Sequence, residues 1–154
     1  MKKGIVLLCL LVCIGSLVGF LFSTKLVENS EKHGIAKIDK KNDVVGKIGD
    51  VTNLDKFQQF LTRVKSGQTD QVRIVHYTDE GDPIFQTLEY DGIEIRYTSD
   101  NSQDKFAGKD KGIESDTCKK ITKDIREEGI RYTLNDCMKE AGRNGYELLS
   151  VPAK

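Results

Sequence analysis

The densest group of side chains able to do chemistry is the acidic turn at residues 78–83, Thr-Asp-Glu-Gly-Asp-Pro. Neighbouring carboxylates act as an acid and base pair when their surroundings move their pKa values apart. Aspartate and glycine are also typical of plain turns, because they tolerate and stabilise turn geometry. We therefore interpret Asp79, Glu80 and Asp82 as candidate binding residues of an exposed turn and not as catalytic residues.

A second acidic group lies in the polar segment that follows. Asp100, Ser102 and Asp104 resemble the start of a calcium-binding loop. Such a loop also needs a glycine for its sharp turn and a closing glutamate, but Phe106 and Lys111 occupy those positions. The pattern predicts no metal site, and Asp100 and Asp104 join the candidate binding residues.

His76 is the only histidine in the predicted folded domain, residues 43–154. It has no second histidine and no serine in a nucleophile-elbow context to work with, so the familiar hydrolase arrangements are incomplete. We expect a neighbouring group to satisfy this histidine on its strand. The sequence accordingly predicts no catalytic residue and no cofactor.

The charge balance excludes a further class of function. From Glu28 onward the chain has 21 basic residues against 24 acidic ones, a formal charge of −3, because Lys2, Lys3 and Lys25 come earlier. This part of the chain has no basic stripe with interleaved aromatic residues, no zinc-like cysteine and histidine spacing and no phosphate-binding glycine motif. Nucleic acid is therefore not an expected partner.

Cys118 and Cys137 are the only cysteines after the apolar amino-terminal segment, and in an exported domain they predict one disulfide. The loop closed by this bond would stabilise the fold by about 3 kcal/mol. The rival interpretation is a reactive thiol pair. That role favours a C-x-x-C spacing or a cation cluster at a helix start, and the sequence offers only Lys119 and Lys120.

The stretch between the cysteines fits two structures. A hairpin turning at residues 127–128 would pair Ile125 with Ile130, Lys123 with Tyr132 and Ile121 with Leu134, and it would bring the cysteines face to face. A helix capped by Ser115 or Asp116 and stopped by Gly129 also satisfies the usual signals. The shared register of the apolar pairs and the cysteines favours the hairpin.

The remaining periodicity predicts one principal helix and several strands. The helix at 54–65 has an apolar face and can be capped by Thr52 or Asn53. Strands are expected at 43–48, 72–77, 84–90, 93–97 and 146–151, with a tight turn at Asp91-Gly92. Residues 100–112 are too polar to be core. The predicted fold class is α+β, an antiparallel sheet of about five to seven strands with one helix.

The first 24 residues decide which side of a membrane the domain occupies. Gly4 to Phe22 is an uncharged run that reaches about 28 Å as a helix, close to the apolar thickness of a bilayer. The small residues of a good cleavage site are missing after it, which favours an uncleaved anchor over a cleaved secretory signal. A lipoprotein site is disfavoured because Leu11 and Val12 precede Cys13.

The anchor predicts the organisation of the whole chain. Lys2 and Lys3 precede the span, so the positive-inside rule keeps the amino terminus cytoplasmic and the rest extracytoplasmic. We expect a membrane anchor at 1–24, a polar stalk at 25–42 and a domain at 43–154. Cleavage of the signal would make the domain a secreted protein. Gly15 and Gly19 form a G-x-x-x-G motif that can bring two anchors together as a weak homodimer.

One stretch also carries a resemblance. Residues 73–84, Arg-Ile-Val-His-Tyr-Thr-Asp-Glu-Gly-Asp-Pro-Ile, together with Leu-Glu-Tyr-Asp-Gly at 88–92 and Asp-Lys-Phe at 104–106, resemble a family of small exported proteins of Gram-positive bacilli. That family is catalogued only as a domain of unknown function, and many relatives look like lipoproteins. The resemblance covers roughly residues 44–137. It implies an extracytoplasmic setting and no activity.

These expectations converge on a membrane-anchored, noncatalytic module of the cell envelope that binds a protein, peptide or wall component through the sheet edge or the two acidic loops. Two alternatives remain. One is a small enzyme that acts on envelope material with the loop carboxylates, and the other is an inhibitor of an exported enzyme.

Overall fold

The computed structural model describes residues 36–47 and 49–153. The predicted anchor at 1–24, most of the stalk and the Gly15–Gly19 contact lie outside these residues and stay predictions. In the described part, no helix is both long and apolar enough to cross a membrane. Lys37–Lys154 form one compact unit, and all the described core residues lie inside it.

The described residues form nine strands, one α-helix and two short 3-10 helices. Their order is β1 (Val44–Lys47), β2 (Asp50–Thr52), α2 (Leu54–Lys65), β3 (Asp70–Tyr77), β4 (Pro83–Tyr90), β5 (Ile95–Asp100), η2 (Gly108–Asp110), β6 (Ile113–Cys118), β7 (Lys120–Arg126), β8 (Gly129–Asn135), η3 (Glu140–Gly142) and β9 (Tyr146–Pro152).

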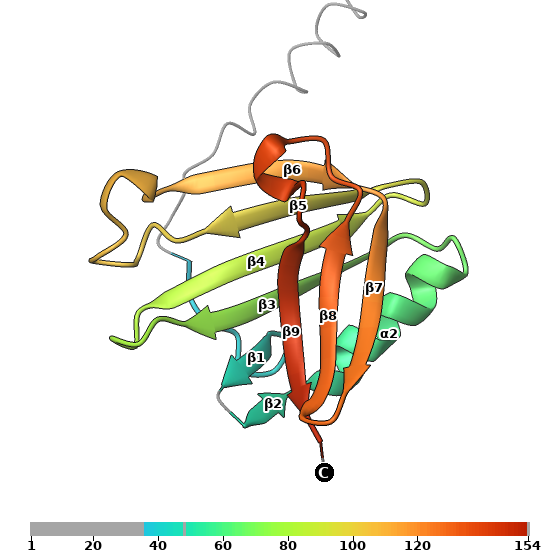
Figure 1. The fold of residues 1–154 in the computed structure, drawn as a ribbon, viewed down its shortest axis with the longest axis horizontal. Helices are drawn as coiled ribbons and strands as arrows, with labels where there is room; N and C mark the ends of the chain where they lie inside the picture. Colours follow the sequence, from blue (N-terminus) through green and yellow to red (C-terminus); the bar gives the residue numbers. More distant parts are fainter. Residues whose placement is uncertain (1–35, 48, 154) are drawn as a thin grey trace, which may run out of the picture. The chain divides into compact units, whose positions relative to one another are not determined.

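The strands form two sheets, with β2-β1-β3-β4-β5-β6 in one and β7-β8-β9 in the other. The small sheet lies across one face of the large sheet, with α2 beside it (Figure 1). The described residues therefore form an α+β fold with one α-helix, as predicted for the domain, but the single antiparallel sheet of five to seven strands is wrong. Only Lys119 separates β6 from β7, so the chain changes sheets at this corner and starts a second layer.

Most neighbouring strands are antiparallel, and the exception is the pair β1 and β3. These two strands run parallel and pair only at Val44 with Ile74 and Val45 with Val75. The ladder between β1 and β3 ends there, while on its other edge β1 continues to pair with β2, through Gly46 with Val51 and Lys47 with Asp50. A parallel connection needs a crossover, and α2 supplies it between β1 and β3.

The predicted helix at 54–65 is confirmed, and it covers the core between the two sheets. Phe57 and Phe60 are fully buried, and the Phe57 ring meets Tyr132 of β8 edge-on, with 5.0 Å between ring centroids. The predicted side-chain cap of this helix is not formed. Asn53 occupies the cap position in a left-handed conformation, but its Nδ2 donates to the carbonyl of Asp43 and makes no side-chain cap.

The hairpin interpretation of 118–137 is confirmed, and the helix alternative is wrong. β7 and β8 pair in the predicted register, with Ile121 opposite Leu134 and Ile125 opposite Ile130. The ladder ends at Lys120 opposite Asn135, so the cysteines lie just beyond it. Their disulfide is confirmed, with an S–S distance of 2.03 Å. Because Cys118 belongs to β6, the bond joins the large sheet to the segment that follows β8.

Besides the short strand β2, which was not predicted, two further parts differ from the sequence prediction. The turn after β4 spans residues 91–94 because the Asp91 carboxylate accepts from the backbone N–H groups of Ile93 and Glu94. Ile93 is consequently 84% exposed and lies outside β5. The second difference is β6, which the sequence analysis did not predict. Its sequence, Ile-Glu-Ser-Asp-Thr-Cys, lacks the apolar alternation of a strand because it forms an edge of the large sheet.

Candidate functional site

The structure brings the two predicted acidic loops together through one residue, Asp82. Its carboxylate accepts a hydrogen bond from the backbone N–H of Lys105 at 3.0 Å and from the Lys105 Nζ at 3.1 Å. The backbone hydrogen bond is the largest cause that lowers the pKa of Asp82, the side-chain hydrogen bond adds to it, and burial opposes both. Asp82 is thus a charged, paired residue that joins the β3–β4 turn to the β5–β6 loop.

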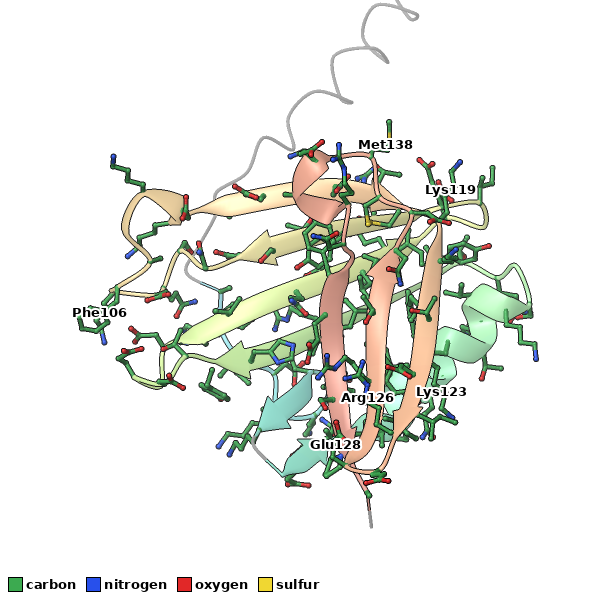
Figure 2. All side chains as sticks on the ribbon, viewed as in Figure 1. Phe106, Lys119, Lys123, Arg126, Glu128 and Met138 are labelled. Atoms are coloured by element: carbon green, nitrogen blue, oxygen red, sulfur yellow. A yellow bond between two sulfur atoms is a disulfide. The ribbon has the colours of Figure 1, made fainter. Side chains whose placement is uncertain are left out.

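The acids of the second loop are used within that loop. Asp100 accepts from the backbone N–H of Ser102, and Asp104 accepts from that of Phe106. Phe106 itself projects from the end of this loop and is 72% exposed (Figure 2). In the described part of the chain, only Asp79 and Glu80 of the five predicted binding residues have neither a hydrogen bond nor an ion pair. Both are exposed.

A cleft of about 780 Å³ lies beside this turn, and Asp79 contributes to its wall. The cleft is located where β1 and β3 separate, because Gly46 and Lys47 lie on one side and His76 and Tyr77 on the other. The remaining wall comes from β9 and the acidic turn. The lining residues are Gly46, Lys47, His76, Tyr77, Thr78, Asp79, Gly81, Glu147, Leu149 and Ser150.

An irregularity in β9 shapes the cleft. The pairing of β8 with β9 shifts by one residue, from Tyr132 opposite Leu149 to Thr133 opposite Glu147, so Leu148 is the extra residue of a β-bulge. Both leucines are buried. A bulge of this kind bends the strand that carries it. Two side chains of the large sheet bind the bent segment, which connects the sheets at the cleft.

His76 and Gln86 are these two side chains. The His76 Nε2 lies 2.9 Å from the Leu148 carbonyl and 3.2 Å from the Gln86 Oε1, and the Gln86 Nε2 donates to the Glu147 carbonyl. Both neighbours of Nε2 are acceptors, so Nε2 carries a proton. The ring is then fixed with Nδ1 toward Gly46. A methyl group at position 46 would lie 3.2 Å from this atom. The expectation that a neighbour satisfies His76 is confirmed.

The charges around the cleft are unequal. Lys47 is the cationic residue of the lining, whereas Asp79 and Glu147 are acidic and Glu80 follows Asp79 in the turn. The Glu147 carboxylate lies 3.6 Å from the Arg131 Nε, and its side chain is 55% exposed. The cleft therefore combines an apolar floor at Leu149 with exposed carboxylates at its rim.

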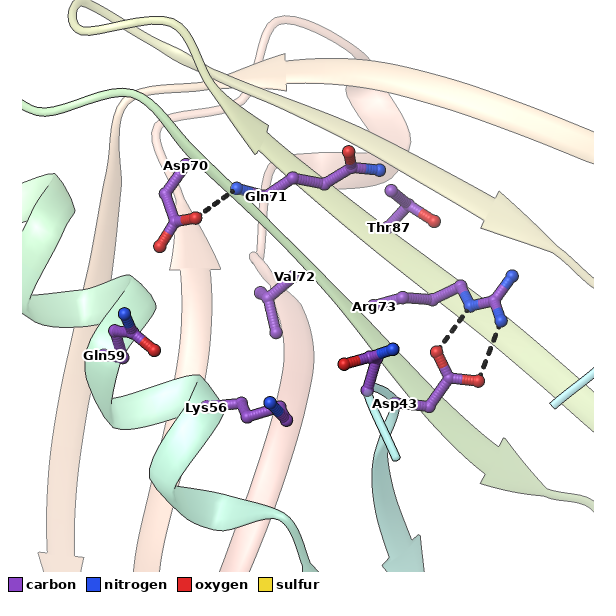
Figure 3. A pocket seen from close by; sticks show the side chains of 9 residues that line it. Asp43, Lys56, Gln59, Asp70, Gln71, Val72, Arg73 and Thr87 are labelled. Atoms are coloured by element: carbon purple, nitrogen blue, oxygen red, sulfur yellow. Dashed lines mark hydrogen bonds and ion pairs between the residues drawn. The ribbon is translucent and has the colours of Figure 1, made fainter. Parts of the chain in front are cut away.

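A second, polar cavity of about 450 Å³ lies between α2 and the first residues of β3 (Figure 3). Its central feature is Arg73, which donates from Nε and Nη2 to the two oxygens of buried Asp43, each at 2.8 Å. The same Nη2 donates to the Lys37 carbonyl, and the guanidinium lies 5.2 Å from the Phe85 ring centroid. Arg73 thus holds residues 37–43 against β3, and its charge is already paired.

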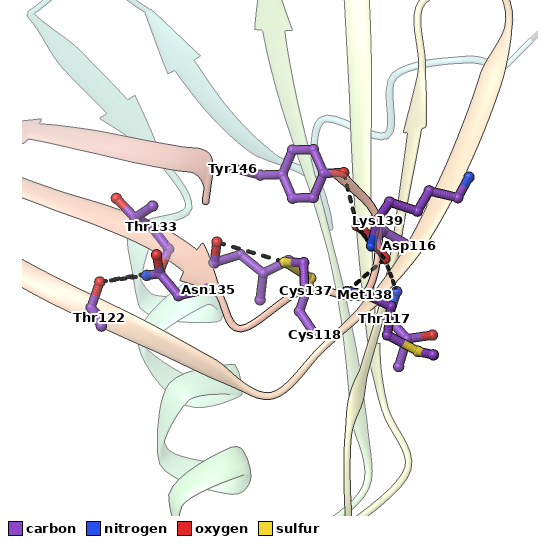
Figure 4. The surroundings of a disulfide bond; sticks show 11 residues. Asp116, Thr117, Cys118, Thr122, Thr133, Asn135, Cys137, Met138, Lys139 and Tyr146 are labelled. Atoms are coloured by element: carbon purple, nitrogen blue, oxygen red, sulfur yellow. Dashed lines mark hydrogen bonds between the residues drawn. A yellow bond between two sulfur atoms is a disulfide. The ribbon is translucent and has the colours of Figure 1, made fainter. Parts of the chain in front are cut away.

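A third polar cluster surrounds the disulfide (Figure 4). Asp116 is 5% exposed and accepts from the backbone N–H groups of Thr117, Met138 and Lys139 and from the Tyr146 hydroxyl. Burial acts to raise the pKa of Asp116, but these hydrogen bonds outweigh it and lower the pKa. Burial, followed by the hydrogen bond to Asp116, raises the pKa of Tyr146 to about 12.

The Asp116 cluster also has the composition of a metal site, since its carboxylate and the sulfurs of Cys118 and Cys137 lie within 4.8 Å of one another. The sulfurs are bonded to each other, however, and the carboxylate is occupied by four donors. Thiolates and not disulfide sulfurs bind metals. The cluster is therefore structural in the disulfide form.

Comparison with known proteins identifies the family. A family model described as a domain of unknown function (DUF4362) matches residues 41–133. The chain belongs to this family. The match includes β1 to β7, most of β8 and the turn at 78–83, so it contains the β1 and β3 walls of the cleft. No curated protein and no solved structure matches the chain.

The sequence analysis missed the part of the cleft that β9 supplies. Glu147, Leu149 and Ser150 form the last strand, which the alternation predicts, but nothing local shows that this strand lies beside His76. The one sequence signal for this contact was His76 itself, because a histidine on a core strand requires a polar partner. That partner is the Leu148 carbonyl of β9.

Proposed function

We propose that this protein is a noncatalytic binding module displayed outside the cytoplasmic membrane, with the cleft between β1, β3 and β9 as its binding site. The amino-terminal segment would hold it at the membrane, and a component of the cell envelope would be its ligand. The observation that supports this proposal is the cleft itself. It has an apolar floor and several polar groups that converge on it, which is the usual composition of a ligand site.

The acidic residues support binding over catalysis. A carboxylate pair that divides acid and base roles needs one member with a raised pKa. Asp82 has a lowered pKa and a lysine partner, and Asp100 and Asp104 accept hydrogen bonds from their own loop. The proton on the His76 Nε2 is held by two acceptors and is directed away from Gly46. These loop carboxylates and His76 therefore hold the structure in place, and none of them is arranged to transfer a proton to a ligand.

The experiment is a pull-down with the full-length chain in nonionic detergent, its disulfide formed, against solubilised envelope proteins and isolated cell wall. The comparison uses Ser150→Trp, which places a large ring at the exposed β9 wall of the cleft. We expect a component that is retained at physiological salt by the native protein and lost with Ser150→Trp. Ile93→Trp, at an exposed turn outside the cleft, is the matched control and should retain it.

Two results would contradict the proposal. Retention of the same component by Ser150→Trp would show that the ligand binds elsewhere, and no retained component would remove the binding role. Turnover of wall material that Ser150→Trp abolishes would favour the enzyme alternative.

A further inference from the structure

The geometry points to an extended peptide segment with a cationic amine side chain as the ligand of the cleft. This inference rests on the proposed function and adds the chemical class of the ligand. Three features carry it: the edge that β3 presents where its ladder with β1 ends, the volume and apolar floor of the cleft, and the distribution of charge around the rim.

The first feature is the separation of β1 from β3. A parallel ladder that continued past Val45 would bring Gly46 opposite His76 and Lys47 opposite Tyr77, but the ladder between β1 and β3 ends at Val45 and Val75. The last residues of β3 therefore have a strand on the β4 side and the cleft on the β1 side. A strand edge offers backbone donors and acceptors at the spacing of another extended chain, which is how peptides add to sheets.

The second feature is the size and floor of the cleft. A volume of about 780 Å³ accommodates a few residues of extended chain and exceeds what one small ion requires. Leu149 is 1% exposed and forms an apolar floor, and the Tyr77 side chain is 39% exposed at the wall. Gly46 keeps this wall open, since a side chain there would meet the His76 ring and Leu149. Side chains that alternate along a bound strand would find an apolar surface on one side.

The third feature selects the charge of the ligand. Asp79 lies at the rim without a protein partner in the described residues. Glu147 lies on the facing strand, and its side chain is 55% exposed although its carboxylate lies 3.6 Å from the Arg131 Nε. An amine carries three N–H donors and no acceptor, so carboxylates at a rim suit it. A tyrosine ring near the carboxylates adds cation–π attraction. The formal charge of −3 beyond residue 27 favours the approach of a cation over that of an anion.

The test measures binding of fluorescein-labelled heptapeptides Gly-Thr-Val-Lys-Val-Thr-Gly by anisotropy, with the full-length chain in nonionic detergent. Matched peptides carry norleucine or glutamate in place of lysine. We expect the lysine peptide to bind about tenfold more tightly than the norleucine peptide and the glutamate peptide to bind most weakly. The double variant Asp79→Asn with Glu147→Gln should remove most of the lysine preference, whereas Glu94→Gln, on the turn at the other end of β4, should preserve it.

Each outcome decides a separate point. Equal binding of the lysine and norleucine peptides, or a lysine preference that survives the double variant, overturns the cationic ligand. Lysine-peptide binding that persists in Ser150→Trp overturns the cleft as its site. If envelope material is retained through the cleft but no peptide binds, the proposed function stands and the peptide inference fails. If neither binds, both fail.

Discussion

The two ends of β9 treat polar groups in opposite ways. At its start, Tyr146 donates to Asp116, whose carboxylate also holds three backbone N–H groups beside the disulfide. Four residues further, Ser150 is exposed and faces a cleft in which Asp79 has no partner among the described residues. One region uses its hydrogen-bonding capacity internally, and the other leaves it available. The difference separates residues that stabilise the fold from residues able to recognise a ligand.

The change with the largest expected effect is Asp116→Ala. It removes the carboxylate that accepts from the Thr117 and Lys139 backbone N–H groups and from the Tyr146 hydroxyl, whereas the Met138 N–H keeps the Thr117 carbonyl as its acceptor. Buried donors cost about 1–3 kcal/mol each when they are unpaired. Because solvent will reach some of them, we expect a loss of about 4 kcal/mol in the free energy of unfolding. Urea denaturation of the unit 37–154 measures this, and a loss below about 1 kcal/mol would contradict the structural role of Asp116.

Removal of the disulfide should be the next largest effect. Cys118 and Cys137 are separated by 19 positions, and closure of such a loop stabilises a domain by about 3 kcal/mol. We expect Cys118→Ala with Cys137→Ala to lower the midpoint of urea unfolding accordingly while the lysine-peptide affinity of the cleft stays within twofold. A parallel loss of affinity in protein that is still folded would show that the two regions are coupled and not separate.

Tyr146→Phe should have a smaller, pH-dependent effect. It removes one hydrogen bond to Asp116, which costs about 1–1.5 kcal/mol at neutral pH. Because the native pKa of Tyr146 is raised from 10.0 to about 12, its stabilisation is complete below pH 10 and is lost as the pH rises toward 12. The difference between native protein and Tyr146→Phe should therefore shrink over this interval. Urea midpoints measured in short incubations at pH 8, 10 and 11.5 test this, and a constant difference would refute it.

The smallest effect on stability is expected at the cleft. Asp79→Asn should change the free energy of unfolding by about 0.5 kcal/mol or less, because the side chain is exposed and unpaired in the described structure. Asp82→Asn, three residues away, should lower stability more because it breaks the contact with Lys105. For lysine-peptide affinity the order should reverse. Equal effects of the two substitutions on both measurements would remove the distinction between the paired and the available acid.

The sequence predicted the local structure well where pattern and turn chemistry act over a short range. The apolar face of 54–65 predicted the helix and its approximate ends, and the alternation around Glu127-Glu128 predicted both the hairpin and its register. The cysteine pair predicted the disulfide. Local patterns were less informative in two places. Ile93 belongs to a turn held by the Asp91 carboxylate and not to the predicted strand, and β6 lacks an apolar alternation because it is an edge strand.

The sequence by itself thus determined the α+β class, the helix, the hairpin and the disulfide, and it identified the acidic turn. Only the tertiary structure decided that there are two sheets, that Asp82 pairs with Lys105 and that Asp79 borders a cleft. The contact that builds this cleft joins His76 to Leu148 across 72 positions of the chain. Helix periodicity and turn preferences act over a few residues, whereas the meeting of β3 with the bulge in β9 depends on how the two sheets pack.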